Sequence, residues 1–208
     1  LMVGGAGGAY TYMASHFNEC YNLLASALRR YNLTGVDIDI EEPFSLDLTR
    51  RLIRQLRIDF PKLNISMAPL LGSLTADQPG MGGFIYKDLM KSFEGSMISW
   101  FNVQSYASYT FDDFEAMVTN GYPPDKLVFG MVFNQFNRDT FAYALATLKA
   151  VKLAYPKFGG AMIWEYFMAP PDRTRNPATW AVEVAKACGE SLRTRHWLTC
   201  LWSLSLLV

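Results

Sequence analysis

The strongest constraint on the fold is an alternation of short apolar runs with longer segments of helical period, repeated about six times along the chain. The apolar runs have the length and β-branched content of buried strands, and they fall at residues 1–3, 36–40, 65–69, 98–104, 127–132 and 161–164. Helices are expected between them, at 17–31, 45–60, 110–121, 141–153 and 177–188. This alternation predicts βαβ units and an α/β fold whose parallel sheet is buried on both faces. A doubly wound open sheet and a (β/α)₈ barrel both fit.

Local signals mark several helix ends. Ser45 is the expected N-cap of the helix through residue 60, and Thr110 with Asp113 resembles a capping box ended by Gly121. Pro177 suits the first turn of the last helix. The helix after Ser45 carries a basic face, for which a solvated surface is favoured over an anion-binding one; its members are Arg50, Arg51, Arg54 and Arg57.

Composition excludes several classes of protein. Half of the 208 residues are hydrophobic and 18% are charged, which excludes intrinsic disorder. Nineteen basic residues balance nineteen acidic ones, so no electrostatic attraction to nucleic acid or to an acidic membrane is expected. The apolar run 197–208 is shorter than the ~20 residues that span a bilayer. The three cysteines have no metal-binding spacing. We expect no metal, no cofactor, no membrane association and no obligate protein partner.

The segment TGVDIDIEE, at residues 34–42, carries the chemistry. Strand alternation predicts that Asp37, Asp39 and Glu41 share one face, while the opposite face is apolar. Carboxyls this close in a dry interior cannot all ionise, so at least one should stay protonated near neutral pH, as a general acid must be. Two alternatives remain: a solvent-facing edge strand, and a D-x-D site for a divalent cation.

This segment resembles the signature of glycoside hydrolase family 18, the chitinases and endo-β-N-acetylglucosaminidases. The family motif is D-x-x-D-x-D-x-E at the end of barrel strand four, and Thr34 replaces its first Asp. The resemblance extends to strands three, six and eight of the family barrel, through MVGG at 2–5 with Met2 in place of serine, FNVQSY at 101–106 and GGAMIWEYF at 159–167. The ending WEYF and the doubled Glu41-Glu42 look most like fungal members.

The resemblance implies an incomplete (β/α)₈ barrel of about six βα units, corresponding to family strands 3 to 8. Residues 1–190 would form this partial barrel, and 191–208 a hydrophobic tail outside the resemblance. Because such barrels usually have about 250 residues, the sequence is expected to be a fragment that begins at strand three.

The resemblance also implies a retaining, substrate-assisted hydrolysis, in which the 2-acetamido oxygen of the substrate attacks the anomeric carbon. Glu41 would be the general acid and then the base. Asp39 would orient the acetamide and stabilise the positive charge, and Asp37 would tune Asp39. Tyr106 would donate a hydrogen bond to the acetamide oxygen.

Four further residues complete the expected site. The resemblance places Gln104 beside Tyr106 and makes Trp164 the apolar floor under the sugar. Met67 and Asn134 are expected wall residues, because they lie at predicted strand ends where active-site residues of such barrels gather. The alternative for Tyr106, Gln104 and Trp164 is a packing role in the core. Other aromatic residues are expected to be core first and sugar contacts second, namely Trp100, Phe101, Tyr109, Phe133 and Phe136.

Three functions remain open at the level of sequence. The first is hydrolysis of β-1,4-linked N-acetylglucosamine in chitin or in the chitobiose core of N-glycans. The second is carbohydrate binding without catalysis, which the presence of Glu41 disfavours. The third is a metal-dependent transferase that uses Asp37 and Asp39. The resemblance implies an extracellular protein, and the sequons at Asn32 and Asn64 are compatible with secretion.

Overall fold

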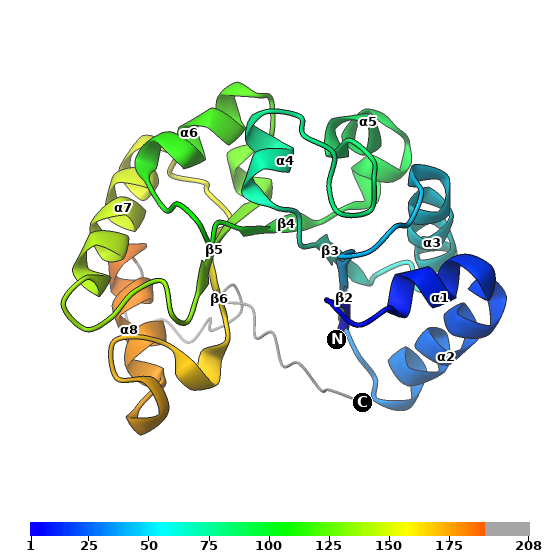
Figure 1. Ribbon diagram of the computed structural model, residues 1–208, viewed down its shortest axis with the longest axis horizontal. Coiled ribbons are helices and arrows are strands. Elements are labelled where there is room, and N and C mark those ends of the chain that lie inside the picture. The colour runs from blue at the N-terminus through cyan, green and yellow to red at the C-terminus, as the bar shows by residue number, and fades with distance from the viewer. Residues whose placement is uncertain (190–208) are drawn as a thin grey trace. The chain divides into compact units, whose positions relative to one another are not determined.

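The computed structural model describes residues 1–189 (Figure 1), so the expected tail at 191–208 lies outside the described residues. Each of the six apolar runs overlaps a strand: β1 (Met2–Gly4), β2 (Gly35–Asp39), β3 (Asn64–Met67), β4 (Trp100–Gln104), β5 (Leu127–Val132) and β6 (Gly160–Trp164). Within this part of the chain the strands follow one another in the sheet in chain order, from β1 to β6. The pairs β1–β2, β2–β3, β3–β4 and β5–β6 are parallel, which confirms the predicted α/β fold.

The five expected helices are also present, as α2 (Phe17–Arg30), α3 (Leu46–Asp59), α6 (Phe111–Thr119), α7 (Phe141–Ala154) and α8 (Ala178–Ala187). The structure adds short helices that the periodicity did not reveal. They are α1 (Ala9–Ser15), α4 (Leu71–Thr75), α5 (Tyr86–Lys91) and the 3₁₀ turns η1 (Glu94–Met97), η2 (Pro124–Lys126), η3 (Tyr166–Met168) and η4 (Arg173–Arg175). Segments of one or two turns are too short to establish a period of 3.6 residues.

The structure confirms the predicted helix caps at Ser45 and Thr110. The Ser45 hydroxyl accepts a hydrogen bond from the Leu48 backbone N–H at 3.3 Å, and Thr110 with Asp113 forms the reciprocal capping box of α6. Gly121 follows α6 with a φ of 97°, a conformation that suits glycine. Pro177 is the N-cap of α8 rather than a residue of its first turn, a difference of one position.

The chain divides within β4 into two compact units, residues 1–101 and 102–189 of the described part, and each is considered by itself. In the first unit, Ile38, Met67 and Phe101 are completely buried, and register pairs Met67 with both others. The ring of Tyr86 from α5 packs edge-on against Phe101, with centroids 6.1 Å apart. The side chains of these three residues therefore lie on the face of the sheet that the helices cover. The side chains of the preceding registered pair, Asp37 and Ser66, lie on the opposite face.

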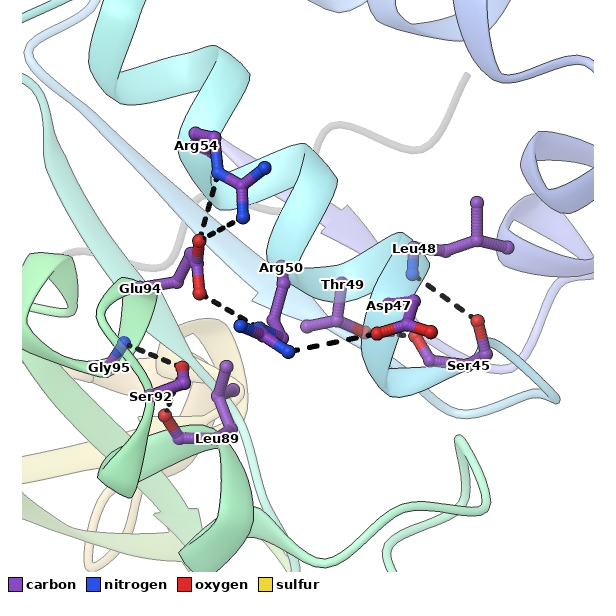
Figure 2. A network of polar contacts seen from close by, with 10 residues as sticks. All are labelled: Ser45, Asp47, Leu48, Thr49, Arg50, Arg54, Leu89, Ser92, Glu94 and Gly95. Carbon is purple, nitrogen blue, oxygen red and sulfur yellow. Dashed lines mark hydrogen bonds and ion pairs between the residues drawn. The ribbon is translucent and has the colours of Figure 1, made fainter.

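The basic face of α3 is exposed at Arg51 and Arg54, as expected of a solvated face, and its guanidinium groups also make contacts within the first unit. Arg50 and Arg54 both donate to the carboxylate of Glu94 at the start of η1, with Nε distances of 2.8 and 2.9 Å (Figure 2). Arg51 donates to Asn18 and lies 3.9 Å from the ring centroid of Phe17, and Arg57 donates to the carbonyls of Pro61 and Met97. All four guanidinium groups therefore connect α3 to neighbouring segments of the first unit.

In the second unit, β5 pairs with β6, and the end of β4 lies beside β5, where the Ser105 N–H donates to the Gly130 carbonyl at 3.2 Å. A Cβ at Gly130 would lie 2.3 Å from the Val103 carbonyl, so only glycine permits this approach. Phe129 stacks on Tyr109 at 3.9 Å between centroids. None of the helices in residues 1–189 combines the length and apolar content required to cross a bilayer.

Candidate active site

The carboxylate strand β2 is an interior strand of the sheet. It pairs with β1 on one side and β3 on the other, which eliminates the edge-strand alternative. Asp37 and Asp39 lie in β2 itself, and Asp39 is 6% exposed. Strand alternation places both carboxylates on the face opposite Ile38. Glu41 lies two residues beyond the end of β2 and is half-buried, so alternation no longer determines its direction.

Ser66, the third residue of the sequon at Asn64, binds one of these carboxylates. Ser66 of β3 lies in register with Asp37 and donates its hydroxyl hydrogen to Asp37 Oδ1 at 2.6 Å. Ser66 is itself buried. The available signal was a polar residue between the apolar Ile65 and Met67 on a buried strand, next to the acidic strand.

The loop after β1 approaches the end of β2 very closely. The Gly5 N–H donates to the Asp39 carbonyl at 2.9 Å, and a Cβ at Gly4 would lie 2.0 Å from the same oxygen. Gly4 and Gly5 have φ of 109° and 83°, which other residues adopt only with strain. The glycine pair in MVGG is therefore required by the contact with the carboxylate strand.

The ring of Tyr10, on α1, packs against Gly4. It is almost completely buried, and its hydroxyl donates to the Val3 carbonyl at 2.9 Å. Burial, and next the negative charges of Asp39 and Asp37, raise the pKa of Tyr10 well above its usual range. The phenol therefore stays neutral and remains a hydrogen-bond donor next to the acidic strand.

Glu42, beside Glu41, is bound by main-chain donors of the same loop. Its Oε1 accepts from the N–H groups of Gly7, at 2.9 Å, and of Gly8, and its Oε2 accepts from Tyr10 N–H at 2.9 Å. Burial alone would raise the pKa of Glu42, but these backbone donors outweigh it and lower the pKa. Glu42 is therefore an ionised carboxylate whose oxygens are already engaged.

Met67 is not brought together with the carboxylates. It is completely buried and lies in register with Ile38, so its side chain belongs to the helix-covered face. Strand-end position alone suggested a wall residue. The alternation of side chains, fixed by Ser66 next to Asp37, gives Met67 a packing role.

In the second unit, the expected residues lie at or after the carboxyl ends of its strands. Gln104 is the last residue of β4 and is 8% exposed, and Tyr106 follows two positions later, half-buried. Trp164 is the last residue of β6, half-buried and in register with Val132, and Asn134 is exposed two residues after β5. The Trp164–Glu165 peptide bond is cis. Tyr109, stacked on Phe129 and edge-on to Phe136, is a core residue as expected.

The sequence reading missed Gln135. Its side-chain amide donates to the Ser105 carbonyl at 2.8 Å, and its carbonyl oxygen accepts from Val132 N–H at 3.3 Å. Because Ser105 immediately precedes Tyr106, Gln135 links the backbone next to Tyr106 to Val132, the last residue of β5. No sequence pattern identifies such a bridge, since both of its partners are main-chain groups.

Comparisons with known proteins place this geometry in a family. No protein-family model and no curated protein matches the chain. Among solved structures, the chain is similar to a fungal endo-β-N-acetylglucosaminidase from glycosyl hydrolase family 18, with a TM-score of 0.80 and 30% identity over 95% of this chain and 72% of that one. It is also similar to a chitinase from Aspergillus fumigatus, with a TM-score of 0.73 and 32% identity over 89% of this chain and 71% of that one. The chain belongs to glycoside hydrolase family 18.

The family-18 fold explains the arrangement of the described strands. A family-18 chitinase from Pseudoalteromonas aurantia shares the fold, with a TM-score of 0.67 and 21% identity over 90% of this chain and 75% of that one. The six parallel strands of the described residues correspond to an incomplete barrel of the family-18 type, as expected from the sequence. The family signature falls on β2 and the residues after it, so Glu41 occupies its last position.

Proposed function

We propose that this family-18 protein is a glycosidase that cleaves β-1,4-linked N-acetylglucosamine, in chitin or in the chitobiose core of N-glycans, by substrate-assisted catalysis with retention. The observation that carries the proposal is the acidic strand. Asp37 and Asp39 lie on the face of β2 opposite its apolar residues, and Glu41 follows at the carboxyl end, where barrel enzymes hold their catalytic groups.

In this proposal, Glu41 begins the reaction as a protonated acid. It gives its proton to the glycosidic oxygen as the bond to the anomeric carbon breaks, and the acetamido carbonyl oxygen of the substrate forms a bond to that carbon. The oxazolinium intermediate is then opened by water, whose proton Glu41 takes back as a carboxylate. Two displacements at the same carbon leave its configuration unchanged.

The two aspartates serve the acetamide in this mechanism. Asp39, buried at the level of Gly4 and Gly5, orients the acetamide N–H and stabilises the charge that develops on the ring. Asp37, held by the Ser66 hydroxyl, tunes Asp39 from two residues earlier on the same face. Both oxygens of Glu42 accept main-chain N–H bonds, which leaves Glu42 unsuited to the role of acid.

The residues of the second unit are proposed as substrate contacts. Tyr106 donates to the acetamide oxygen, Gln104 lies beside it, and Trp164 provides an apolar surface for a sugar face. Asn134 is an exposed wall residue. This assignment is supported by the position of these residues at or just after the ends of β4, β5 and β6.

Turnover of a chromogenic N,N′-diacetylchitobioside tests the proposal. The wild-type chain should release the chromophore, EDTA should not change the rate, and Glu41→Gln should lower kcat by about 10³-fold because the proton donor is lost. Glu19→Gln, the same change at an exposed position of α2, is the matched control and should behave as wild type.

Two other functions predict different results. Tight binding of the chitobioside without turnover indicates a carbohydrate-binding relative. Strict dependence on Mn²⁺ indicates a D-x-D transferase; within residues 1–189 no group of three or more His, Cys, Asp or Glu side chains is arranged to hold a metal ion.

The proposal includes an extracellular location. The similarity to family-18 glycosidases supports the proposed substrates, and polymeric chitin and mature N-glycans are reached outside the cytosol. Asn32, the first residue of its sequon, is exposed in the turn that follows α2.

A further inference from the structure

Two adjacent glutamates at the end of β2 have different surroundings, and the difference gives Glu42 a role. The carboxylate of Glu42 receives the N–H groups of Gly7, Gly8 and Tyr10, residues that lie more than thirty positions earlier in the chain. These are the donors at and before the start of α1, which have no partners within a helix of their own. Glu42 therefore binds the first loop of the described chain through main-chain groups alone.

The same loop contacts the chain on both sides of Glu41. Before Glu41, the Asp39 carbonyl accepts from Gly5 N–H at 2.9 Å. After Glu41, Glu42 takes up the three loop donors, and Phe44 packs against the Tyr10 ring with centroids 5.0 Å apart. Ile40 and Glu41 thus lie between two anchored positions, on the segment beyond the end of β2.

The anchors depend on glycine. Gly5 and Gly8 have φ of 83° and 81°, so another residue at either position strains the turn that points the N–H groups toward Asp39 and Glu42. Gly7 differs from them, because its φ is outside the left-handed region and a Cβ there would have nothing within 4 Å. The loop therefore contains both sensitive and tolerant glycines, which provides a matched pair for experiment.

We propose that Glu42 is a positioning residue for the general acid: by holding the loop of residues 4–10 against residues 39–44, it fixes the backbone from which Glu41 reaches the glycosidic oxygen. The inference rests on the proposed function for the identity of the acid. The contact between Glu42 and the loop is independent of that function and can be measured in the absence of turnover.

The competing explanation is that Glu42 only caps α1. A cap stabilises the helix, and its loss would loosen residues 4–13 without changing the segment around Glu41 or the rate per folded molecule. A positioning residue transmits its loss to residues 38–44 and lowers kcat while KM is retained, because substrate binding is not its task. The two explanations therefore differ in where amide exchange rises and in which kinetic constant changes.

The experiment compares Glu42→Gln with wild type and with Glu19→Gln, by amide hydrogen exchange and by chitobioside turnover. The glutamine retains the size of the side chain but directs an NH₂ group at main-chain donors. We expect exchange at least 10-fold faster in both segments, 4–13 and 38–44, a kcat about 10- to 100-fold lower, as for misplacement of a catalytic group, and a KM within about twofold. Glu19→Gln should change neither measurement.

Faster exchange confined to residues 4–13 with an unchanged kcat would overturn the proposal in favour of a simple cap. If the wild type has no turnover, the proposed function fails, yet the exchange pattern still decides whether Glu42 fixes the segment that carries Glu41. If Glu42→Gln does not fold, the pair Gly8→Ala and Gly7→Ala gives the same decision, because both N–H groups donate to Glu42 but only Gly8 has a φ in the left-handed region. The first should raise exchange in both segments, and the second in neither.

Discussion

Glu42 and Glu94 are two buried or half-buried carboxylates of the same compact unit, and they are held by different chemistry. Glu94, 1% exposed, receives the guanidinium groups of Arg50 and Arg54 and joins η1 to α3 (Figure 2). Glu42 receives main-chain N–H groups and joins the first loop to the end of β2. Burial alone would raise the pKa of each carboxyl, but the hydrogen-bond donors outweigh it. The pKa of Glu94 therefore falls to about 2, and the pKa of Glu42 is also lowered.

The two sets of donors differ in the backbone conformation that they require. The Glu94 cluster joins α3 to η1 through side chains on a regular helix, so it requires no special loop conformation. Main-chain donors are rigid, and the loop must adopt glycine-specific angles to present them. We therefore assign the Glu94 cluster to stability and the Glu42 contacts to the geometry of the proposed site.

The largest expected effect on stability comes from Glu94→Gln. Removing the charge weakens hydrogen bonds to two guanidinium groups, and we expect a loss of about 2 kcal/mol in the free energy of unfolding, measured in urea. The kcat should stay within about twofold of wild type. Asp47→Asn is the control, because Asp47 is 93% exposed and 3.8 Å from Arg50, and it should be silent. A large drop in kcat for Glu94→Gln would break the proposed division of roles.

A smaller effect is expected in the pH dependence of stability. The folded pKa of Glu94, about 2, lies below its ordinary value of 4.5, so its contribution is complete above pH 4.5 and is lost as the pH falls toward 2. The difference in unfolding free energy between wild type and Glu94→Gln should therefore be constant above about pH 5 and shrink below it. Glu42→Gln should show the same sign. A difference that grows on acidification would contradict the assigned donors.

The elements of the fold were predictable because their signals are local. The six apolar runs, the Ser45 cap and the capping box of Thr110 with Asp113 each depend on residues within a few positions of one another. The acidic strand was also readable, because the alternation of Asp37 and Asp39 with apolar residues identifies a strand with one unusual face.

The supporting contacts were not predictable from the sequence. The partners of Glu42 lie more than thirty residues away and are main-chain N–H groups, which every residue except proline possesses. The contacts of the α3 arginines were not predictable either, because Glu94, the partner of Arg50 and Arg54, lies forty or more residues later in the sequence. Met67 was predicted to be a wall residue for a related reason. Its position at a strand end could be read from the sequence, but the face of the sheet on which its side chain lies depends on the register of β3 against β2.

The most direct test of the account is the anomeric configuration of the first product. Proton NMR during hydrolysis of an N-acetylglucosamine oligomer by the wild-type chain resolves the two anomers before they equilibrate. Substrate-assisted cleavage with Glu41 as acid and then base predicts that the β-anomer appears first. Initial release of the α-anomer, or no release of product, would contradict the central claim.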